Sequence, residues 1–320
     1  MKRDLLIREF NRKLDHIIQE DLPILKKVKA FVIKSGGKRI RPLIHYFFTQ
    51  LLDYRGDEWR DVGAIGELVH AASLVHDDVI DEATMRRGQP SVNALHGNKN
   101  AVLAGDYLLA CGLDHLGTLT HSRELLPVFT RVIRMLSVAE LLQEENETKL
   151  DLSQKVYERI IVGKTGVLFA AMTETAAILA GVQGKRREQY REFGEKLGLV
   201  FQIRDDYLDY YDDGSDGKDL YQDFKRGLVT RPLILLRDKM SRKERKELER
   251  VWAGEALRAN PAAMETMLAY GDRHGIRRAL AVEIETEVHG LMRFVREHPQ
   301  SEVREAVLEQ LTRLLVPVEG

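Results

Sequence analysis

Apolar residues recur at intervals of three and four along most of the chain, which is the pattern of helices that bury one face. One such stripe comprises Ile65, Leu68, Val69, Ala72, Val75 and Val79. Sustained alternation of apolar and polar residues with hairpin turns is scarce, so a large sheet is not expected. The breaks, for example at 181–184 and 212–217, are shorter than flexible interdomain linkers. The pattern predicts an all-α fold of ten or more helices in a single domain that spans residues 1–320.

Composition narrows the classes of function. Lys and Arg (49) nearly balance Asp and Glu (50), and a net charge of −1 argues against general binding to nucleic acid. The single cysteine, Cys111, rules out an internal disulfide framework and indicates a reducing compartment. The first residues mix charged with apolar side chains, and no stretch approaches the ~20 apolar residues that cross a bilayer. We therefore expect a cytoplasmic protein without a transmembrane segment.

Two acidic motifs of the form D-D-x-x-D follow apolar helical stretches, the first at 77–81 and the second at 205–209. On a helix, the first and last aspartates of each motif share a face, and like charges at that spacing repel. Carboxylate oxygens select hard cations, Mg²⁺ or Mn²⁺, which complete their shells with water and substrate phosphates. One motif alone could be a solvated helix end, but two in the same phase favour a metal site. The candidate ligands are Asp77, Asp78, Asp81, Asp205, Asp206 and Asp209.

Basic residues lie near the first motif in the sequence. Arg86 and Arg87 follow it, and a Gly-Gly turn upstream presents Lys38 and Arg41 before a proline. Arg offers a bidentate fork for phosphate and Lys a compact charge, so these side chains suit anion binding, although a basic loop can serve solubility alone. Further polar side chains follow glycines, two of them in a break that can point them into a cavity and one after the second motif: Lys164, Thr165 and Lys218.

Five segments in this order resemble the trans-isoprenyl diphosphate synthases, the polyprenyl synthetase family, of the medium- to long-chain type. They are residues 37–42, 70–88, 105–108, 163–166 and 201–209, and the stretch HAASLVHDDVIDEATMRRG at 70–88 is highly specific. The resemblance implies long helices around a deep central cavity. It implies sequential 1'-4 condensation of isopentenyl diphosphate with an allylic diphosphate. It also implies three Mg²⁺ ions, with Mn²⁺ as a substitute, and a homodimer, while a small accessory subunit stays open.

The resemblance assigns roles by position. The six motif aspartates would hold Mg²⁺ on the allylic diphosphate, which Arg86, Lys164 and Lys218 would neutralise. Isopentenyl diphosphate would contact Lys38, Arg41, His70 and Arg87, and the reacting centre would be lined by Thr165 and Gln202. Cleavage of the allylic C–O bond places negative charge on the diphosphate and positive charge on carbon, so metals and cations are the groups that this chemistry needs. No side-chain nucleophile is required, so Cys111 need not be catalytic.

One segment departs from the family pattern. The family often has Gly-Lys-x-Thr before a proline after the second motif, whereas this chain has Leu228 in place of that lysine. No diphosphate contact is therefore assigned there. Neighbouring cations are candidates to substitute for it: Lys225, Arg226 or Arg231.

Two small residues, Ala72 and Ser73, lie one helical turn before the first motif, where bulky aromatics often block the product tunnel in short-chain relatives. We therefore expect a product longer than C20, in the range of about C30 to C40, unless these residues only make a tight helix contact. The floor of the tunnel would come from Val69, Phe129, Val132 or Met135.

Other functions fit the sequence less well. A class I terpene cyclase shares one aspartate-rich motif, but its second motif is usually of the N-S-E type, which 205–209 lacks. A metal phosphohydrolase built on His76 and Asp77 would leave the second motif unexplained. A short-chain synthase (C15–C20) and the catalytic subunit of a heteromeric synthase stay open. A non-catalytic helical lipid- or metal-binding protein is a remote alternative, because its aspartates should have eroded.

Overall fold

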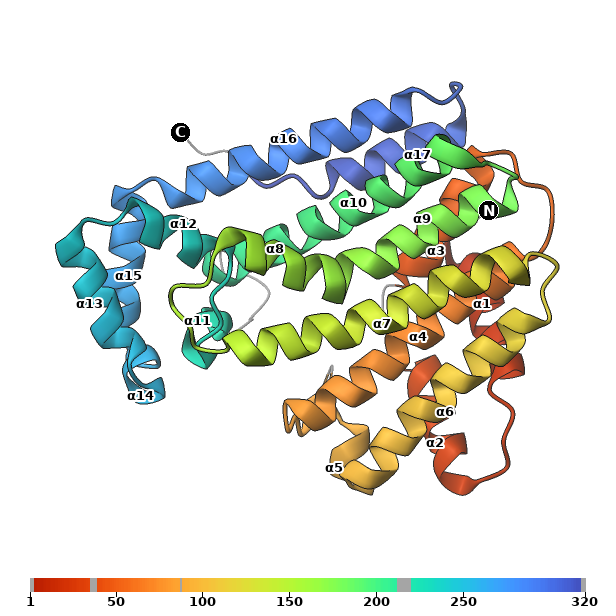
Figure 1. The fold of residues 1–320 in the computed structure, drawn as a ribbon, viewed down its shortest axis with the longest axis horizontal. Coiled ribbons are helices and arrows are strands. Elements are labelled where there is room, and N and C mark those ends of the chain that lie inside the picture. Colours follow the sequence, from red (N-terminus) through yellow and green to blue (C-terminus); the bar gives the residue numbers. More distant parts are fainter. Residues whose placement is uncertain (1–2, 35–38, 87, 212–219, 318–320) are drawn as a thin grey trace. The chain divides into compact units, whose positions relative to one another are not determined.

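The structure is a computed structural model that describes residues 3–34, 39–86, 88–211 and 220–317. Within these ranges the regular secondary structure is helical apart from one β-hairpin of two two-residue strands, which confirms the predicted all-α fold (Figure 1). The chain folds into two compact units, the first comprising Met1–Leu136 and Val167–Gly194, the second Ser137–Gly166 and Glu195–Gly320. That the two units form one domain over 1–320 stays a prediction.

The first unit is built around one central helix, α4 (Trp59–Ile80), which contacts α1 (Arg3–Ile17), α3 (Ile40–Leu51), α6 (Asn98–Gly117) and α9 (Val167–Leu179). Small residues allow this crowding, because a Cβ at Gly63 would lie 2.6 Å from the Phe10 ring. The unit also contains the following elements: α2 (Pro23–Lys34), β1 (Met85–Arg86), β2 (Gln89–Pro90) and α5 (Val92–His96). Helices α7 (Ser122–Asn146) and α10 (Gly184–Tyr211) contribute to both units.

Helix α9 is buried at every position, and its polar side chains are matched within the first unit. Glu174 accepts hydrogen bonds from Arg131 and from Arg187, the latter at 2.9 Å and 3.0 Å. His45 bonds the Met172 carbonyl at 2.9 Å, and burial lowers the pKa of His45 to about 4, so its imidazole is neutral. This pairing is what burial of polar groups requires.

One stretch among the described residues, Gln154–Leu179, is long and apolar enough to cross a membrane by length and composition. Its most apolar window is 83% buried inside the protein, as core helices of soluble proteins also are. The stretch comprises α8 (Gln154–Ile161), the π-helical turn η1 (Val162–Gly166) and α9. The pattern of apolar residues did not single out this stretch because Lys155, Lys164 and Glu158 interrupt its apolar run.

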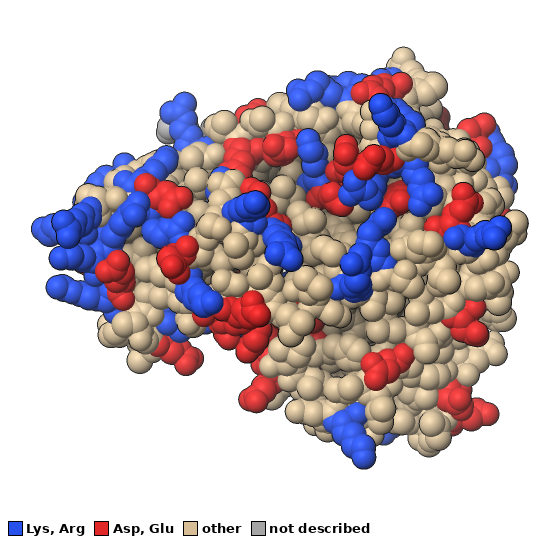
Figure 2. Space-filling view, in the orientation of Figure 1, with Lys and Arg blue, Asp and Glu red and all other residues tan. Residues whose placement is uncertain are grey.

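The second unit packs α12 (Arg231–Lys239) against α16 (Ile276–Arg296), which also contacts α15 (Pro261–Arg273) and α17 (Glu302–Thr312). Its remaining helices are α11 (Gln222–Arg226), α13 (Arg242–Trp252) and α14 (Glu255–Arg258). Ser241 and Glu244 form a capping box that fixes the start of α13. Figure 2 shows Lys and Arg gathered over the end of this unit that carries α13.

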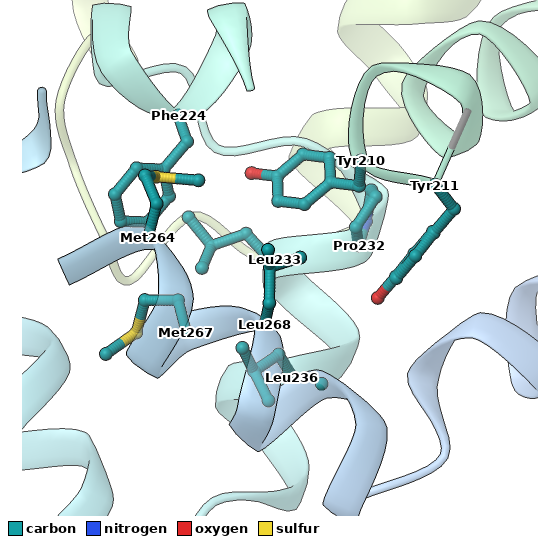
Figure 3. Close-up of a pocket in the computed structure, with 10 residues that line it drawn as sticks. Tyr210, Tyr211, Phe224, Pro232, Leu233, Leu236, Met264, Met267 and Leu268 are labelled. Carbon is teal, nitrogen blue, oxygen red and sulfur yellow. The ribbon is translucent and has the colours of Figure 1, made fainter. Parts of the chain in front are cut away.

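A small apolar pocket lies within the second unit, between the C-terminal end of α10, α12 and α15 (Figure 3). Tyr210, Leu233 and Met264 are among the residues that line it. Among the described residues, no Lys, Arg or acidic side chain lines this pocket, so it lacks the cationic groups that a diphosphate needs and we interpret it as a packing gap in the core.

Candidate active site

The first aspartate motif lies at the C-terminal end of α4, where the helix dipole is negative and carboxylates are unfavourable. Asp77 is half-buried, Asp78 is fully buried and Asp81 is the exposed C-cap residue. Three negative side chains at this helix end therefore need cations nearby.

Arg86 supplies one of these cations. The hairpin of β1 and β2 turns the chain back, so that the Arg86 guanidinium donates to Asp78 Oδ1 from Nε at 2.8 Å and also from Nη2. Asn93 holds the loop in place by donating to the Asp78 and Ala83 carbonyl oxygens, each at 3.0 Å. The second oxygen, Asp78 Oδ2, is buried and has no hydrogen-bond partner among the described residues. Arg86 was expected at the diphosphate, and in the structure its guanidinium pairs with a carboxylate of the motif itself.

The residues expected to bind isopentenyl diphosphate are partly described. Arg41 begins α3 and its guanidinium lies 5.3 Å from the Phe169 ring centroid, while His70 is half-buried on α4. Arg39, between the expected contacts Lys38 and Arg41, is instead buried, with Nη1 2.6 Å from Glu67 Oε1. Three expected contacts lie outside the described residues: Lys38, Arg87 and Lys218.

The second aspartate motif occupies the last two turns of α10, again at a negative helix end. Asp206 Oδ2 accepts from the Tyr157 hydroxyl at 2.5 Å and from the Arg231 backbone N–H at 3.3 Å. Its Oδ1 accepts from Gln202 Nε2 at 3.1 Å. Burial raises the pKa of Asp206 to about 6, despite these hydrogen bonds, which favour the ionised form. Asp206 is thus held by the protein on both oxygens.

Asp209 and Asp205 are placed differently from Asp206. Asp209 Oδ1 accepts from the Gln222 N–H at 3.0 Å and Oδ2 from the Asp223 N–H at 3.2 Å, so Asp209 caps the start of α11. Burial raises the pKa of Asp209 as well. Asp205 is exposed, and none of the described Lys and Arg residues pairs with it. Asp205 is therefore the carboxylate of this motif that is open to a ligand.

The π-helical turn η1 places Lys164 and Thr165 beside α10. A Cβ at Gly198 would lie 2.5 Å from the Gly166 Cα, so the two glycines let the backbones touch. Thr165 Oγ1 donates to Gln202 Oε1 at 3.1 Å, which joins both predicted reaction-centre residues to Asp206 in one hydrogen-bonded chain. Lys164 Nζ lies 2.7 Å from Glu140 Oε2 and 3.1 Å from Gln143 Oε1. Four residues that were assigned to the site from the sequence therefore lie together in the second unit: Lys164, Thr165, Gln202 and Asp206.

Comparison with known proteins decides the family. The family model described as polyprenyl synthetase matches residues 22–269 of this chain. The chain belongs to the polyprenyl synthetase family. The family enzyme is a prenyltransferase, a trans-polyprenyl diphosphate synthase, and the predicted resemblance is confirmed.

Individual relatives agree with this assignment. The synthase is 34% identical over 218 residues to octaprenyl diphosphate synthase of Escherichia coli (strain K12), covering 68% of this chain and 67% of that one. It is 38% identical over 245 residues to an all-trans-nonaprenyl-diphosphate synthase (geranyl-diphosphate specific) of Rhodobacter capsulatus, covering 73% and 74%. A polyprenyl synthase of Caulobacter crescentus CB15, solved with calcium and isoprenyl diphosphate, is 30% identical, with a TM-score of 0.86 over 98% of this chain and 97% of that one.

The donor set of the synthase fits a divalent cation. All available ligands are carboxylate oxygens at negative helix ends, and Asp78 Oδ2 is buried without a partner within the described part of the chain. Among the same residues, no group of three or more His, Cys, Asp or Glu side chains is already gathered as a cation site. A bound cation would therefore complete its shell with water or with diphosphate oxygens.

The structure adds an acidic residue that the sequence motifs did not indicate. Burial raises the pKa of Asp223, on α11, to about 8, and the nearby charges of Asp206, Asp209 and Asp205 raise it further. Asp223 lies well after the second motif and outside its D-D-x-x-D spacing, so the motif itself does not indicate it. Its only signal in the sequence is its place in the acidic segment that follows the motif.

Arg231 does not replace the lysine that the family often has at the position of Leu228. The Arg231 guanidinium is bound to Glu283 of α16, with Nε at 3.0 Å and Nη2 at 3.0 Å from its oxygens. Lys225 Nζ donates to the Leu220 carbonyl at 3.0 Å, whereas Arg226 is exposed. Of the three proposed substitutes, Arg226 has the most exposed side chain.

Proposed function

We propose that the chain is a Mg²⁺-dependent trans-polyprenyl diphosphate synthase that adds isopentenyl diphosphate stepwise to an allylic diphosphate primer. The observation that carries this proposal is the pair of aspartate motifs, each at a negative helix end and each with oxygens open to a cation. Small carboxylate-bound cations that retain water and take up substrate phosphates are typical of Mg²⁺. Mn²⁺ would substitute, because it accepts the same oxygen ligands.

Asp77, Asp81 and Asp205 are the residues that would hold Mg²⁺, with Asp78 Oδ2 as a further donor. The bound ion would act as a Lewis acid that stabilises charge on the leaving diphosphate. The resemblance implies that Arg86 and Lys164 would add positive charge for the diphosphate; in the structure Arg86 pairs with Asp78 and Lys164 with Glu140. In the reaction the allylic C–O bond would break, a C–C bond to isopentenyl diphosphate would form, and the released diphosphate would take up the proton that leaves the new chain. Thr165 and Gln202 present oxygens to the developing carbocation, and Asp206 fixes the orientation of Gln202.

The assay that tests this function uses the purified protein alone with Mg²⁺, labelled isopentenyl diphosphate and farnesyl diphosphate. Products are dephosphorylated and sized. We expect a ladder of products that EDTA abolishes and added Mg²⁺ restores. Absence of product in the presence of Mg²⁺ would contradict a self-sufficient synthase, and product restored by a second polypeptide would identify this chain as one subunit of a heteromer.

We propose that the product is longer than C20, because Ala72 is fully buried without bulk and Ser73 is half-buried with its hydroxyl tied to the His70 carbonyl at 2.9 Å. The names of the two relatives above denote products of eight and nine isoprene units. Ala72→Phe should shorten the longest product, whereas Ser73→Ala, which adds no bulk, should leave it unchanged. An unchanged ladder in the Ala72→Phe enzyme would contradict a tunnel at this position.

We further propose a homodimer, without nucleic acid as a partner, in the cytoplasm. The homodimer is supported by three exposed apolar side chains on α5 and α6 of the first unit, where Leu95 is 59%, Leu103 56% and Val102 40% exposed. Sedimentation measures the oligomeric state: we expect the wild type to sediment as a dimer and Leu103→Glu to be shifted toward the monomer. A wild-type monomer at micromolar concentration would contradict the dimer.

A further inference from the structure

The segment at 105–108 resembles the family but has no role in the function proposed above. Its first two residues, Gly105 and Asp106, lie on α6 in the first unit, facing the end of α4. His76, the residue before Asp77, contacts both of them. Its Nε2 lies 3.1 Å from the Val102 carbonyl oxygen and 3.5 Å from Asp106 Oδ1. Because a carbonyl only accepts, Nε2 must carry the proton that is donated to Val102.

Gly105 leaves no room for a side chain at this point. A Cβ there would overlap His76 Nε2 and lie 2.5 Å from Cδ2 and 2.8 Å from Cε1 of the same ring. Gly112, two turns later on the same helix, is different, since a Cβ there would meet Leu68 Cδ2 at 3.4 Å and Ile65 at 3.6 Å, which is ordinary contact. The close approach of α6 to the His76 ring therefore requires a glycine at position 105, whereas position 112 has room for a methyl group.

We propose that His76 is a positioning residue for the first aspartate motif, seated on α6 by Gly105 and Asp106, and that this seat sets the direction in which Asp77 points. The inference deepens the proposed function and rests on it. Like charges and the negative helix dipole both act to fray the last turns of α4. The His76 ring, held between the Val102 carbonyl and the Gly105 backbone, fixes the turn of α4 that carries Asp77. Neighbouring residues on a helix differ by about 100°, so a shift at His76 turns Asp77 with it.

The test compares Gly105→Ala with its matched control, Gly112→Ala. Both add one methyl group to α6, but only Gly105→Ala displaces the His76 ring. We expect Gly105→Ala to raise the Mg²⁺ concentration for half-maximal activity about tenfold, the size of effect seen when groups behind metal ligands are changed. The KM for isopentenyl diphosphate should stay unchanged. Gly112→Ala should change neither value, and equal effects of the two variants would overturn the proposal.

Variants at position 76 test the same link without the methyl group. His76→Ala should raise the Mg²⁺ concentration needed for half-maximal activity. In His76→Gln, whose amide can still donate to the Val102 carbonyl, this concentration should stay close to that of the wild type. Gly105→Ala should cost nothing further in the His76→Ala background, because the clashing ring is gone. Additive losses in the double variant would overturn the clamp.

Two measurements separate this inference from the proposed function. Urea unfolding of the metal-free proteins should show the same non-additivity between positions 76 and 105, with no dependence on catalysis. Titration of Mn²⁺ with inorganic pyrophosphate should show weaker binding to Gly105→Ala than to Gly112→Ala. Non-additive unfolding together with equal Mn²⁺ binding would overturn the positioning role. A wild type that forms no product in the assay above would contradict the proposed function, whatever these results.

Discussion

In the first aspartate motif the middle carboxylate, Asp78, is paired with the Arg86 guanidinium, whereas in the second motif the corresponding carboxylate, Asp206, is enclosed by uncharged donors. Both motifs have the same residue spacing and both lie at a helix C-terminus. Among the described Lys and Arg residues, none forms an ion pair with Asp205, Asp206 or Asp209. Arg231 comes near through its backbone, but its guanidinium binds Glu283.

The difference shows that the same D-D-x-x-D pattern can have its buried carboxylate stabilised either by an ion pair or by uncharged hydrogen-bond donors. The first motif has an internal cation, so its buried charge is partly compensated before any ligand binds. The second motif gathers Asp206, Asp209 and Asp223, and burial raises the pKa of all three. Ionisation of these carboxyls in the metal-free protein is therefore unfavourable, and a metal ion with its diphosphate would offset this cost. We expect the second motif to be more sensitive to metal removal and to pH.

The largest effect is expected at the exposed carboxylate of the second motif. Asp205→Ala should lower turnover about 1,000-fold, the loss that follows when one electrostatic contact to the leaving group is removed. The urea midpoint should not fall, because Asp205 is exposed, pairs with no described cation and repels the neighbouring carboxylates. Asp151→Ala, another exposed acid of the second unit, is the control and should retain full activity. A large loss of stability in Asp205→Ala would show that Asp205 serves the fold as well as catalysis.

The next effect is on stability and concerns Asp206. Asp206→Ala leaves the Tyr157 hydroxyl, the Gln202 amide and the Arg231 N–H without an acceptor, which should lower the free energy of unfolding by about 3 kcal/mol or more. Asp206→Asn keeps one acceptor oxygen and removes the buried charge, so at neutral pH its free energy of unfolding should be no lower than that of the wild type, because the gain from the lost charge offsets the hydrogen bond that the Asn amide nitrogen cannot accept. Urea denaturation at neutral pH measures both. Equal losses in the two variants would contradict the role of the hydrogen bonds.

A pH dependence follows from the raised pKa of Asp206, about 6 against an ordinary value of 3.8. Well below the ordinary pKa of 3.8 the carboxyl is protonated in both states and contributes nothing to the pH dependence. As the pH rises, the unfolded chain ionises first, which favours unfolding, so stability falls until Asp206 ionises in the folded state near pH 6. The total loss is about 3 kcal/mol in the metal-free enzyme.

The measurement is the difference in urea stability between the wild type and Asp206→Asn from pH 4 to pH 8, without metal. The Asn variant should gain on the wild type as the pH rises and the difference should level off near pH 7. Asp223→Asn should behave likewise up to about pH 8, the pKa of Asp223. A difference that does not change with pH would contradict the burial of these carboxyls.

The smallest effect is expected at the first motif. Arg86→Met removes the partner of a carboxylate whose side chain is 1% exposed, and should lower the free energy of unfolding by about 2 kcal/mol, less than for a fully buried pair because Arg86 is 27% exposed. Adding Asp78→Asn should recover most of this loss, since no charge is then left unpaired. If the double variant is no more stable than Arg86→Met, the ion pair is not the cause.

The sequence predicted the helices, the two motifs and the family, because all of these depend on local periodicity and on short segments that need no distant partner. It could not predict how each carboxylate is held. Tyr157 is 49 positions from Asp206 in the chain, and Glu283 is 52 from Arg231. Nothing in the spacing indicates which distant side chain will pack there. The same reason explains why Asp223 was missed and why Arg231 was considered as a diphosphate contact.

The π-helical turn η1 has a consequence for insertions and deletions. If one residue were deleted within Val162–Gly166, the π turn would become an ordinary α turn, and the backbone would stay helical and hydrogen-bonded. Every side chain before the deletion would then be rotated by about 100° relative to every side chain after it. Lys164 and Thr165 could no longer face Glu140 and Gln202 while α9 kept its buried register. Length variation at this turn would therefore yield chains that fold as helices and do not catalyse.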